Sequence, residues 1–129
     1  MENIYIEQSF HTPEVSFDNE KNRLYIVGKS YPEDASKFYE PIVAWLEENI
    51  SEIKDNFSVE IQLDYFNTSS SKYILRIFLM LEDFKKEHPE ITLSITWKYH
   101  PNDEEMKESG IEYQQFVTIP FEFIEEDKD

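Results

Sequence analysis

The segment FSVEIQLDYFNTSSSKYILRIFLMLEDF, Phe57 to Phe84, contains the transition that decides the fold. Apolar and polar side chains alternate from Phe57 to Tyr65, which is the period of a strand with one buried face. From about Ser69 to Glu87 the apolar residues recur at helical spacing instead, and His88-Pro89 ends that pattern. A strand that leads directly into a helix is the repeating unit of α/β sheets, so the segment predicts this fold class.

The flanking sequence extends the alternation of strands and helices in both directions. We expect short strands at residues 14–18 and 23–28, with residues 4–6 as a candidate for one more, a helix at 35–53, a strand at 92–99, a short helix at 103–109 that Gly110 stops, a helical turn at 112–117 and a terminal strand at 118–125. Pro120 indicates that this last strand lies at an edge of the sheet. The predicted fold is α/β: a single domain over residues 1–129, with a mixed sheet of about five strands, helices packed against it and a frayed acidic tail at 125–129.

The charge of the chain restricts its partners. Its 129 residues include 12 basic and 28 acidic side chains, for a formal net charge of −16. Such a surface repels phosphate backbones and anionic lipid headgroups, which argues against nucleic-acid binding and membrane association. The chain has no cysteine, no apolar run long enough for a membrane span and no secretory signal, so we expect a cytoplasmic protein.

Four consecutive hydroxyl side chains, Thr68 to Ser71, stand where the predicted strand gives way to the helix. One oxygen is enough to cap a helix, and serine is a mediocre helix former within the first turn. A helix start at the carboxyl end of a strand also offers free N–H groups and the positive end of the helix dipole to an anion. Two interpretations remain open: a cap followed by an ordinary first turn, or a site for a phosphate carried by one of the hydroxyls.

The same helix carries more apolar residues than one buried face requires. Leu75 and Leu79 point away from the broad face that would cover the sheet. They form either a contact with the helix at 35–53 or an exposed apolar strip for a protein partner, next to the hydroxyl run.

No arrangement of residues makes a positive case for an enzyme. His11, His88 and His100 lie far apart in the sequence and match no metal-binding motif, so we predict neither a metal nor a cofactor. The acids at 103–105 stand at a predicted helix start, where they are ordinary partners of the helix dipole.

Four segments carry a family resemblance: GKSYPEDASKFYEPIVAWL (28–46), LDYFNTSSSKYILRIFLMLE (63–82), ITWKYHPNDEEMKESGIEY (95–113) and IPFEF (119–123). In this order, over residues 3–125, the chain resembles the SiaC family of bacterial regulatory phosphoproteins. The YFNTSSSK and SYPE motifs are the most specific parts of the resemblance. It implies a fold similar to STAS domains of the anti-anti-sigma type.

The resemblance further implies a non-enzymatic partner-switching protein in signal transduction. Thr68 falls on the phosphoacceptor position, and the residues expected to support it are Asn67, Ser69, Ser70, Ser71 and Lys72. An anti-sigma-type Ser/Thr kinase would phosphorylate Thr68, and a PP2C-type phosphatase would reverse the reaction. The unphosphorylated form would bind an output protein, which in characterised members is a diguanylate cyclase, and so promote cyclic-di-GMP signalling and biofilm formation.

Two short regions are the expected contacts with the output protein: Leu75 and Leu79 on the helix, and Tyr31 and Glu33 in the SYPE turn.

The alternative function is that of a small-ligand-binding α/β domain. It would use a crevice at the carboxyl ends of the strands, lined by Tyr65, Trp97 and Tyr99.

Overall fold

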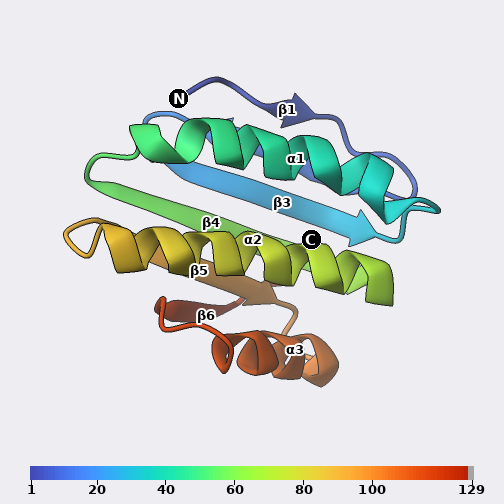
Figure 1. Ribbon diagram of the computed structural model, residues 1–129. Coiled ribbons are helices and arrows are strands. Elements are labelled where there is room, and N and C mark those ends of the chain that lie inside the picture. The colour runs from blue at the N-terminus through green and yellow to red at the C-terminus, as the bar shows by residue number, and fades with distance from the viewer. Residues whose placement is uncertain (128–129) are drawn as a thin grey trace.

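Six strands form one sheet in which the spatial order of the strands, β1 to β6, is their order in the sequence (Figure 1). The computed structural model describes residues 1–127. The elements are β1 (Tyr5–Ile6), β2 (Glu14–Asp18), β3 (Arg23–Ser30), α1 (Ala35–Asn49), a 3-10 turn (Ile50–Glu52), β4 (Asn56–Phe66), α2 (Thr68–Glu87), β5 (Thr92–Tyr99), α3 (Glu104–Gln114) and β6 (Phe121–Glu125). Strands β1 to β3 pair antiparallel, and β3 to β6 pair parallel.

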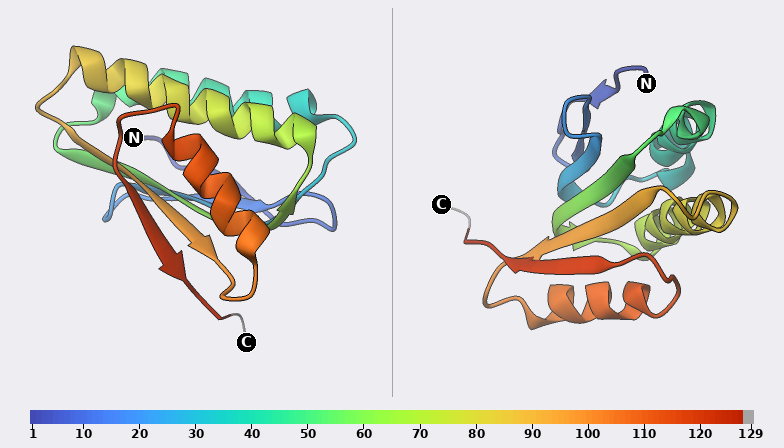
Figure 2. Two further views of the ribbon diagram at one scale, coloured as in Figure 1. Left: turned by 90° about the horizontal axis from the view of Figure 1, so that it is seen from below. Right: turned by 90° about the vertical axis from the view of Figure 1, so that its left-hand side faces the viewer.

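The helices cover one face of the sheet. Figures 1 and 2 show α1 and α2 side by side across that face, with α3 at the end formed by β5 and β6. The ring of Tyr113 on α3 meets that of Phe78 on α2 edge-on, with 5.3 Å between centroids, so α3 packs beside α2. The core lies between this layer and the inward residues of the central strands, such as Ile61 and Ile95, which are fully buried.

The predicted α/β class with a mixed sheet is confirmed, and the number of strands is six rather than about five. The two-residue strand β1 accounts for the difference. The helix predicted at 35–53 ends as an α-helix at Asn49 and continues as a 3-10 turn. Strand β6 begins at Phe121 rather than at 118 and lies at the edge of the sheet, as Pro120 indicated.

Gly110 does not stop a helix, and this prediction was wrong. Helix α3 runs through it without a break, so the separate short helix and later turn are one element. A Cβ atom at Gly110 would lie 2.6 Å from Cδ1 of Trp97 and 2.7 Å from Cε1 of Phe123. The glycine is therefore needed for the close approach of α3 to β5 and β6, and it marks a packing contact rather than a helix end.

The start of the acidic tail is paired with the sheet. The backbone N–H of Glu126 donates to the carbonyl of Tyr99 at 2.9 Å, and its carboxylate lies 2.9 Å from Lys98 Nζ. Lys98 also pairs with Glu60, which pairs with Arg23 on the face of the sheet opposite the helices. Residues 128 and 129, part of the tail predicted to be frayed, lie outside the described residues.

A cluster of three buried hydroxyls connects β3, α1 and α2. Ser30 Oγ donates to Ser70 Oγ at 2.8 Å, and Ser70 Oγ donates to the carbonyl of Ser30 at 3.1 Å. The hydroxyl of Tyr39 lies 2.5 Å from Ser30 Oγ, and with the Ser30 proton already committed Tyr39 is the donor. The same Ser30 carbonyl accepts from the N–H of Asn67 at 2.9 Å. These bonds fix the position where β4 ends and α2 begins.

Replacing Gly110 with alanine is expected to destabilise the protein. Overpacking against Trp97 costs about 1–3 kcal/mol, which outweighs the gain of up to about 1 kcal/mol in helix propensity. Chemical denaturation of Gly110→Ala and of the exposed control Glu108→Ala would measure both free energies of unfolding. A Gly110→Ala protein more stable than the wild type would contradict the close contact.

Ser70 and Ser69 are expected to respond to alanine in opposite directions. Ser70→Ala removes two buried hydrogen bonds and is expected to lower the free energy of unfolding by about 1–2 kcal/mol. Ser69→Ala, one residue away and exposed, changes it by at most about 0.5 kcal/mol, in the stabilising direction. Denaturant titration of the two variants checks the pair, and equal losses would contradict the role of the hydroxyl cluster.

Candidate functional site

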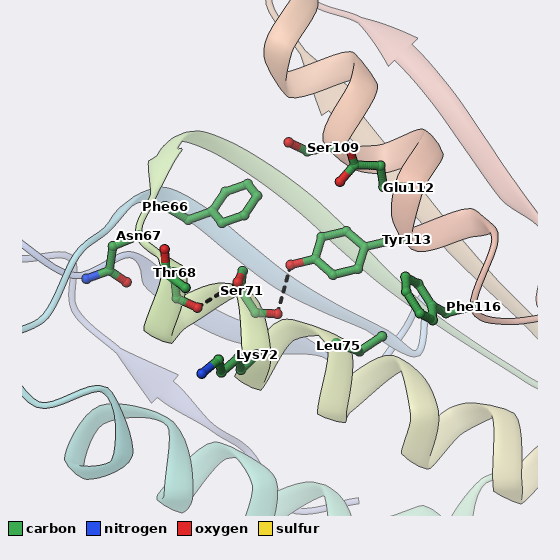
Figure 3. A pocket seen from close by; sticks show the side chains of 10 residues that line it. All are labelled: Phe66, Asn67, Thr68, Ser71, Lys72, Leu75, Ser109, Glu112, Tyr113 and Phe116. Atoms are coloured by element: carbon green, nitrogen blue, oxygen red, sulfur yellow. Dashed lines mark hydrogen bonds between the residues drawn. The ribbon is translucent and has the colours of Figure 1, made fainter.

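A pocket of about 320 Å³ lies between the start of α2 and α3, at the carboxyl end of β4 (Figure 3). Its lining comes from the end of β4, the first turns of α2, and α3 with the residues just after it: Phe66, Asn67, Thr68, Ser71, Lys72, Leu75, Ser109, Glu112, Tyr113 and Phe116. The pocket thus brings four of the predicted residues on α2 together with a second wall that the sequence did not predict. Its position agrees with the rule that α/β sheets carry their sites beyond the carboxyl ends of strands.

Helix α2 is capped by an amide, not by a hydroxyl. Asn67 Oδ1 accepts from the N–H of Ser70 at 2.9 Å, so the hydroxyl cap considered above was wrong. The four hydroxyls then separate by environment. Ser70 is buried in the hydroxyl cluster, and Ser71 Oγ donates to the carbonyl of Thr68 at 2.6 Å. Thr68 and Ser69 are exposed, and within residues 1–127 neither side chain forms a hydrogen bond.

The first turn of α2 lacks negative charge. It has no acidic side chain, although 28 of the 129 residues are acidic and the first turn of α3 has two. Four residues after Thr68, Lys72 is the single cation among the described residues that line the pocket. Positions i and i+4 of a helix lie on one face, so Lys72 is a neighbour of Thr68 on the helix surface. The charge environment of Thr68 therefore suits a negative group.

The second wall of the pocket is α3, fixed to α2 by a tyrosine. The hydroxyl of Tyr113 donates to the carbonyl of Ser71 at 2.8 Å, as Figure 3 shows. Burial raises the pKa of the Tyr113 phenol above its ordinary value, so the hydroxyl stays a donor at neutral pH. Glu112 and the exposed ring of Phe116 complete this wall. In the sequence, the available signal for this wall was the pair of aromatic residues at 113 and 116, which stand about one helical turn apart. The predicted helix stop at Gly110 separated this pair from the helix to which Tyr113 belongs.

The predicted partner contacts fall into two places. Leu75 is partly buried and lines the pocket, so it faces α3 rather than α1, whereas Leu79 is exposed one turn further and does not line it. Tyr31 and Glu33 follow β3 at the same end of the sheet but lie outside the pocket. The Tyr31 ring contacts that of Tyr65 at 5.8 Å, and Glu33 lines a separate cavity at the start of α1.

The three aromatic residues expected to line a small-ligand crevice do not come together, although Tyr65 lines a cavity of about 180 Å³ at the carboxyl end of β4. Trp97 is fully buried and its indole N–H donates to the carbonyl of Met106, so its side chain belongs to the core. Tyr99 is also buried, whereas Tyr65 is exposed, so the three do not share a pocket.

The acids at 103–105 stand at the start of α3, where the sequence placed a helix start. Asp103 caps α3 by accepting from the N–H of Met106 at 3.0 Å, as expected for an acid at a helix start. Within residues 1–127, no group of three or more His, Asp or Glu side chains could hold a metal ion. None of the helices in this range is both long and apolar enough to cross a membrane.

Solved structures of SiaC are similar to this chain over nearly its full length. One is a crystal structure from Pseudomonas aeruginosa, described as diguanylate cyclase SiaD in complex with its activator SiaC. Its SiaC chain is 25% identical to this chain, with a TM-score of 0.87, and the match covers 95% of this chain and 99% of that one. A structure of SiaC alone from the same organism has 25% identity and a TM-score of 0.85, covering 98% and 100%.

The sequence comparisons point to the same group of proteins. An uncharacterised protein of Pseudomonas aeruginosa is 26% identical over 121 residues, which make up 94% of each chain. The sequence model of the family described as SiaC family regulatory phosphoprotein matches residues 6–126. With the family pattern extending over nearly all of its length, the chain belongs to the SiaC family of regulatory phosphoproteins.

Proposed function

We propose that this chain is a non-enzymatic, single-domain partner-switching protein of the cytoplasm, in which reversible phosphorylation of Thr68 controls binding to an output protein. Membership in a family of regulatory phosphoproteins supports the regulatory role. The observation that carries the assignment to Thr68 is its exposed hydroxyl at the edge of the pocket, which forms no hydrogen bond with any of residues 1–127. Ser70 is buried and Ser71 is hydrogen-bonded, so Ser69 is the one competing hydroxyl in the run, and it does not line the pocket.

The proposed output protein is a diguanylate cyclase. SiaC of Pseudomonas aeruginosa, which is described as the activator of the cyclase SiaD, shares the fold of this chain at a TM-score of 0.87. An anti-sigma-type Ser/Thr kinase and a PP2C-type phosphatase are the proposed enzymes that add and remove the phosphate. Phosphorylation of Thr68 would thus regulate cyclic-di-GMP synthesis by controlling whether this chain binds the cyclase.

The charge of the phosphate is the proposed cause of the switch. Phosphorylation adds about two negative charges to a hydroxyl that carries none. Any partner surface seated over Thr68 would have to desolvate that dianion or leave the site. A loss of about 2.7 kcal/mol would weaken binding about a hundredfold, which is enough to separate a bound from a free state.

We expect a purified kinase of this type, with ATP, to add one phosphate to the wild-type chain. Thr68→Ala should remove the modification because the other two hydroxyls among the described lining residues, Ser71 and Ser109, are half-buried and donate to backbone carbonyls. Thr68→Ser and the neighbouring control Ser69→Ala should retain it. Intact-protein mass spectrometry and peptide mapping give the readout. Continued single-site phosphorylation of Thr68→Ala would overturn the assignment.

We also expect phosphothreonine, encoded genetically at position 68, to weaken binding to the diguanylate cyclase of the same bacterium about a hundredfold. Calorimetric titration against the unmodified chain, together with the rate of cyclic-di-GMP formation, gives the comparison. The matched control is phosphothreonine at Thr92, which is exposed at the start of β5 and outside the pocket. Equal weakening by both modifications would argue for a nonspecific effect of charge and against a switch at Thr68.

A further inference from the structure

The helix layer has a second groove at its far end, between the last turns of α1 and α2. A cavity of about 340 Å³ is lined there by side chains from both helices and from the 3-10 turn: Glu47, Ile50, Met80, Asp83, Phe84 and Glu87. We call these residues the distal groove. At a rise of about 1.5 Å per residue, Asp83 lies about 22 Å from Thr68 along the axis of α2. None of the described residues that line the pocket at the start of α2 belongs to the distal groove.

The floor of the distal groove is apolar and partly open to solvent. Phe84 is buried, whereas Ile50 and Met80 are half-buried, so part of each of these two side chains is accessible from the cavity. The four groove residues on α2 follow one another at positions i, i+3, i+4 and i+7, which places them on one face of the helix. Methionine is flexible and adapts to apolar partners of different shape. A groove of this kind between two neighbouring helices is a surface into which a third helix packs.

The rims of the distal groove are acidic on both sides. Glu47 on α1, and Asp83 and Glu87 on α2, are exposed and line the cavity. Within residues 1–127, neither Asp83 nor Glu87 forms an ion pair, and Glu47 has one long contact of 4.0 Å, with Arg76. Like charges on facing helices repel, so this part of the helix layer is electrostatically unfavourable when nothing is bound. A cation between the rims would remove the repulsion.

The dipole of α1 adds to the negative field at this end. The last turn of α1 contains Glu47 and Glu48 and no basic residue. The carboxyl end of a helix already carries a partial charge of roughly −0.5, so acids at that position are unfavourable. The last turn of α2, by contrast, has Lys85 and Lys86. A positive charge supplied by a partner is therefore what the end of α1 lacks.

One turn closer to the start of α2, the chain itself supplies such a cation. The guanidinium of Arg76 on α2 lies 3.0 Å from the carboxylate of Glu40 and 4.0 Å from that of Glu47, both on α1. It thus connects the two helices across their shared surface. Four residues later on the same face stands Met80, so the bridge is not repeated beside Asp83. The position that a cation fills at one level is open at the next.

We propose that the distal groove is the docking surface for a basic amphipathic helix of a protein partner. The helix places one large apolar side chain over Ile50 and Met80, and lysine or arginine side chains about one turn to either side of it. These cations lie between the acidic rims and repeat the bridge that Arg76 makes within the chain. A net charge of −16 attracts basic partners in general, and the apolar floor selects among them a helix with an anchor at this spacing.

Binding at the distal groove does not depend on the state of Thr68. Charges at the surface are largely screened beyond about 8 Å at physiological ionic strength, and Thr68 lies about 22 Å from Asp83 along α2. A phosphate at Thr68 would therefore leave the affinity of the distal groove unchanged. The chain can hold one partner here while the pocket at the start of α2 is free or occupied.

The test selects helices on the full-length chain. The probe is a displayed library of amphipathic helices in which one face varies among leucine, methionine, lysine, arginine and glutamate. We expect enriched peptides to carry one large apolar residue with a basic residue about one turn to each side. Met80→Gln replaces the apolar floor with a polar side chain of similar length and should weaken the enriched peptide about tenfold in a calorimetric titration. Leu79→Gln changes the neighbouring side chain, which is 40% exposed and outside the groove, and should leave the affinity unchanged.

Matched charge variants separate the distal groove from the general acidity of the chain. Glu47→Gln combined with Asp83→Asn should weaken the peptide by about tenfold or more. Glu108→Gln combined with Glu122→Gln changes the net charge equally at exposed positions outside the groove and should have an effect of less than about twofold. Asp83→Lys should also weaken binding, and a glutamate in place of the facing basic residue of the peptide should restore it. Encoded phosphothreonine at position 68 should leave the affinity unchanged.

Four results would overturn the inference: no enriched helix, equal losses for Met80→Gln and Leu79→Gln, equal losses for the two pairs of charge variants, or no rescue by the exchanged charge. A phosphothreonine at position 68 that weakens the peptide as much as Met80→Gln does would place the binding at the start of α2 and also overturn it. Thermal unfolding of each variant shows that it is folded when its affinity is measured. The result is separate from the kinase assay, because a chain that no kinase modifies would still bind these helices.

Discussion

The carbonyl of Ser30 holds the start of α2, with its candidate site, in place against β3. It accepts both the N–H of Asn67 and the hydroxyl of Ser70, so the last residue of β3 is tied to the cap and first turn of α2. Tyr39 adds the third hydroxyl from α1. Because these groups are buried, an unmade bond among them would cost about 1–3 kcal/mol, which makes the arrangement cooperative. The exposure of Thr68 follows from the burial of Ser70, because residues two apart in a helix point to nearly opposite sides.

The two walls of the pocket have different origins. The α2 wall follows from the strand-to-helix junction, where the chain leaves the sheet and the helix begins. The α3 wall depends on Gly110, which lets that helix approach Trp97 closely enough for Tyr113 to reach the carbonyl of Ser71. A change at Gly110 would therefore alter the width of the pocket, about one helical turn further along α3, although Gly110 is not one of the residues that line it.

Much of the fold could be predicted because its signals are local. The alternation at 57–65 and the apolar spacing at 69–87 gave a strand and a helix within one or two residues of β4 and α2. What could not be predicted depends on contacts between distant residues. Gly110 has the sequence signature of a helix stop, and only its contact with Trp97 shows that it is a packing position. Likewise, the sequence does not distinguish Ser70 from Ser69, because the burial of Ser70 depends on its contact with the distant Ser30. The phosphoacceptor role of Thr68 came from the family resemblance and remains a proposal.

The order of the strands has a consequence for the way the chain forms. Each strand from β2 onward pairs with the one synthesised just before it, so no strand has to be inserted between two that are already in place. From β3 to β6 each new pairing closes a loop that contains a single helix, which keeps the entropy of closure small. The sheet can thus grow from one edge as the polypeptide leaves the ribosome, and α3 with β6 is added last. The α2 side of the pocket would then be complete before the α3 side exists.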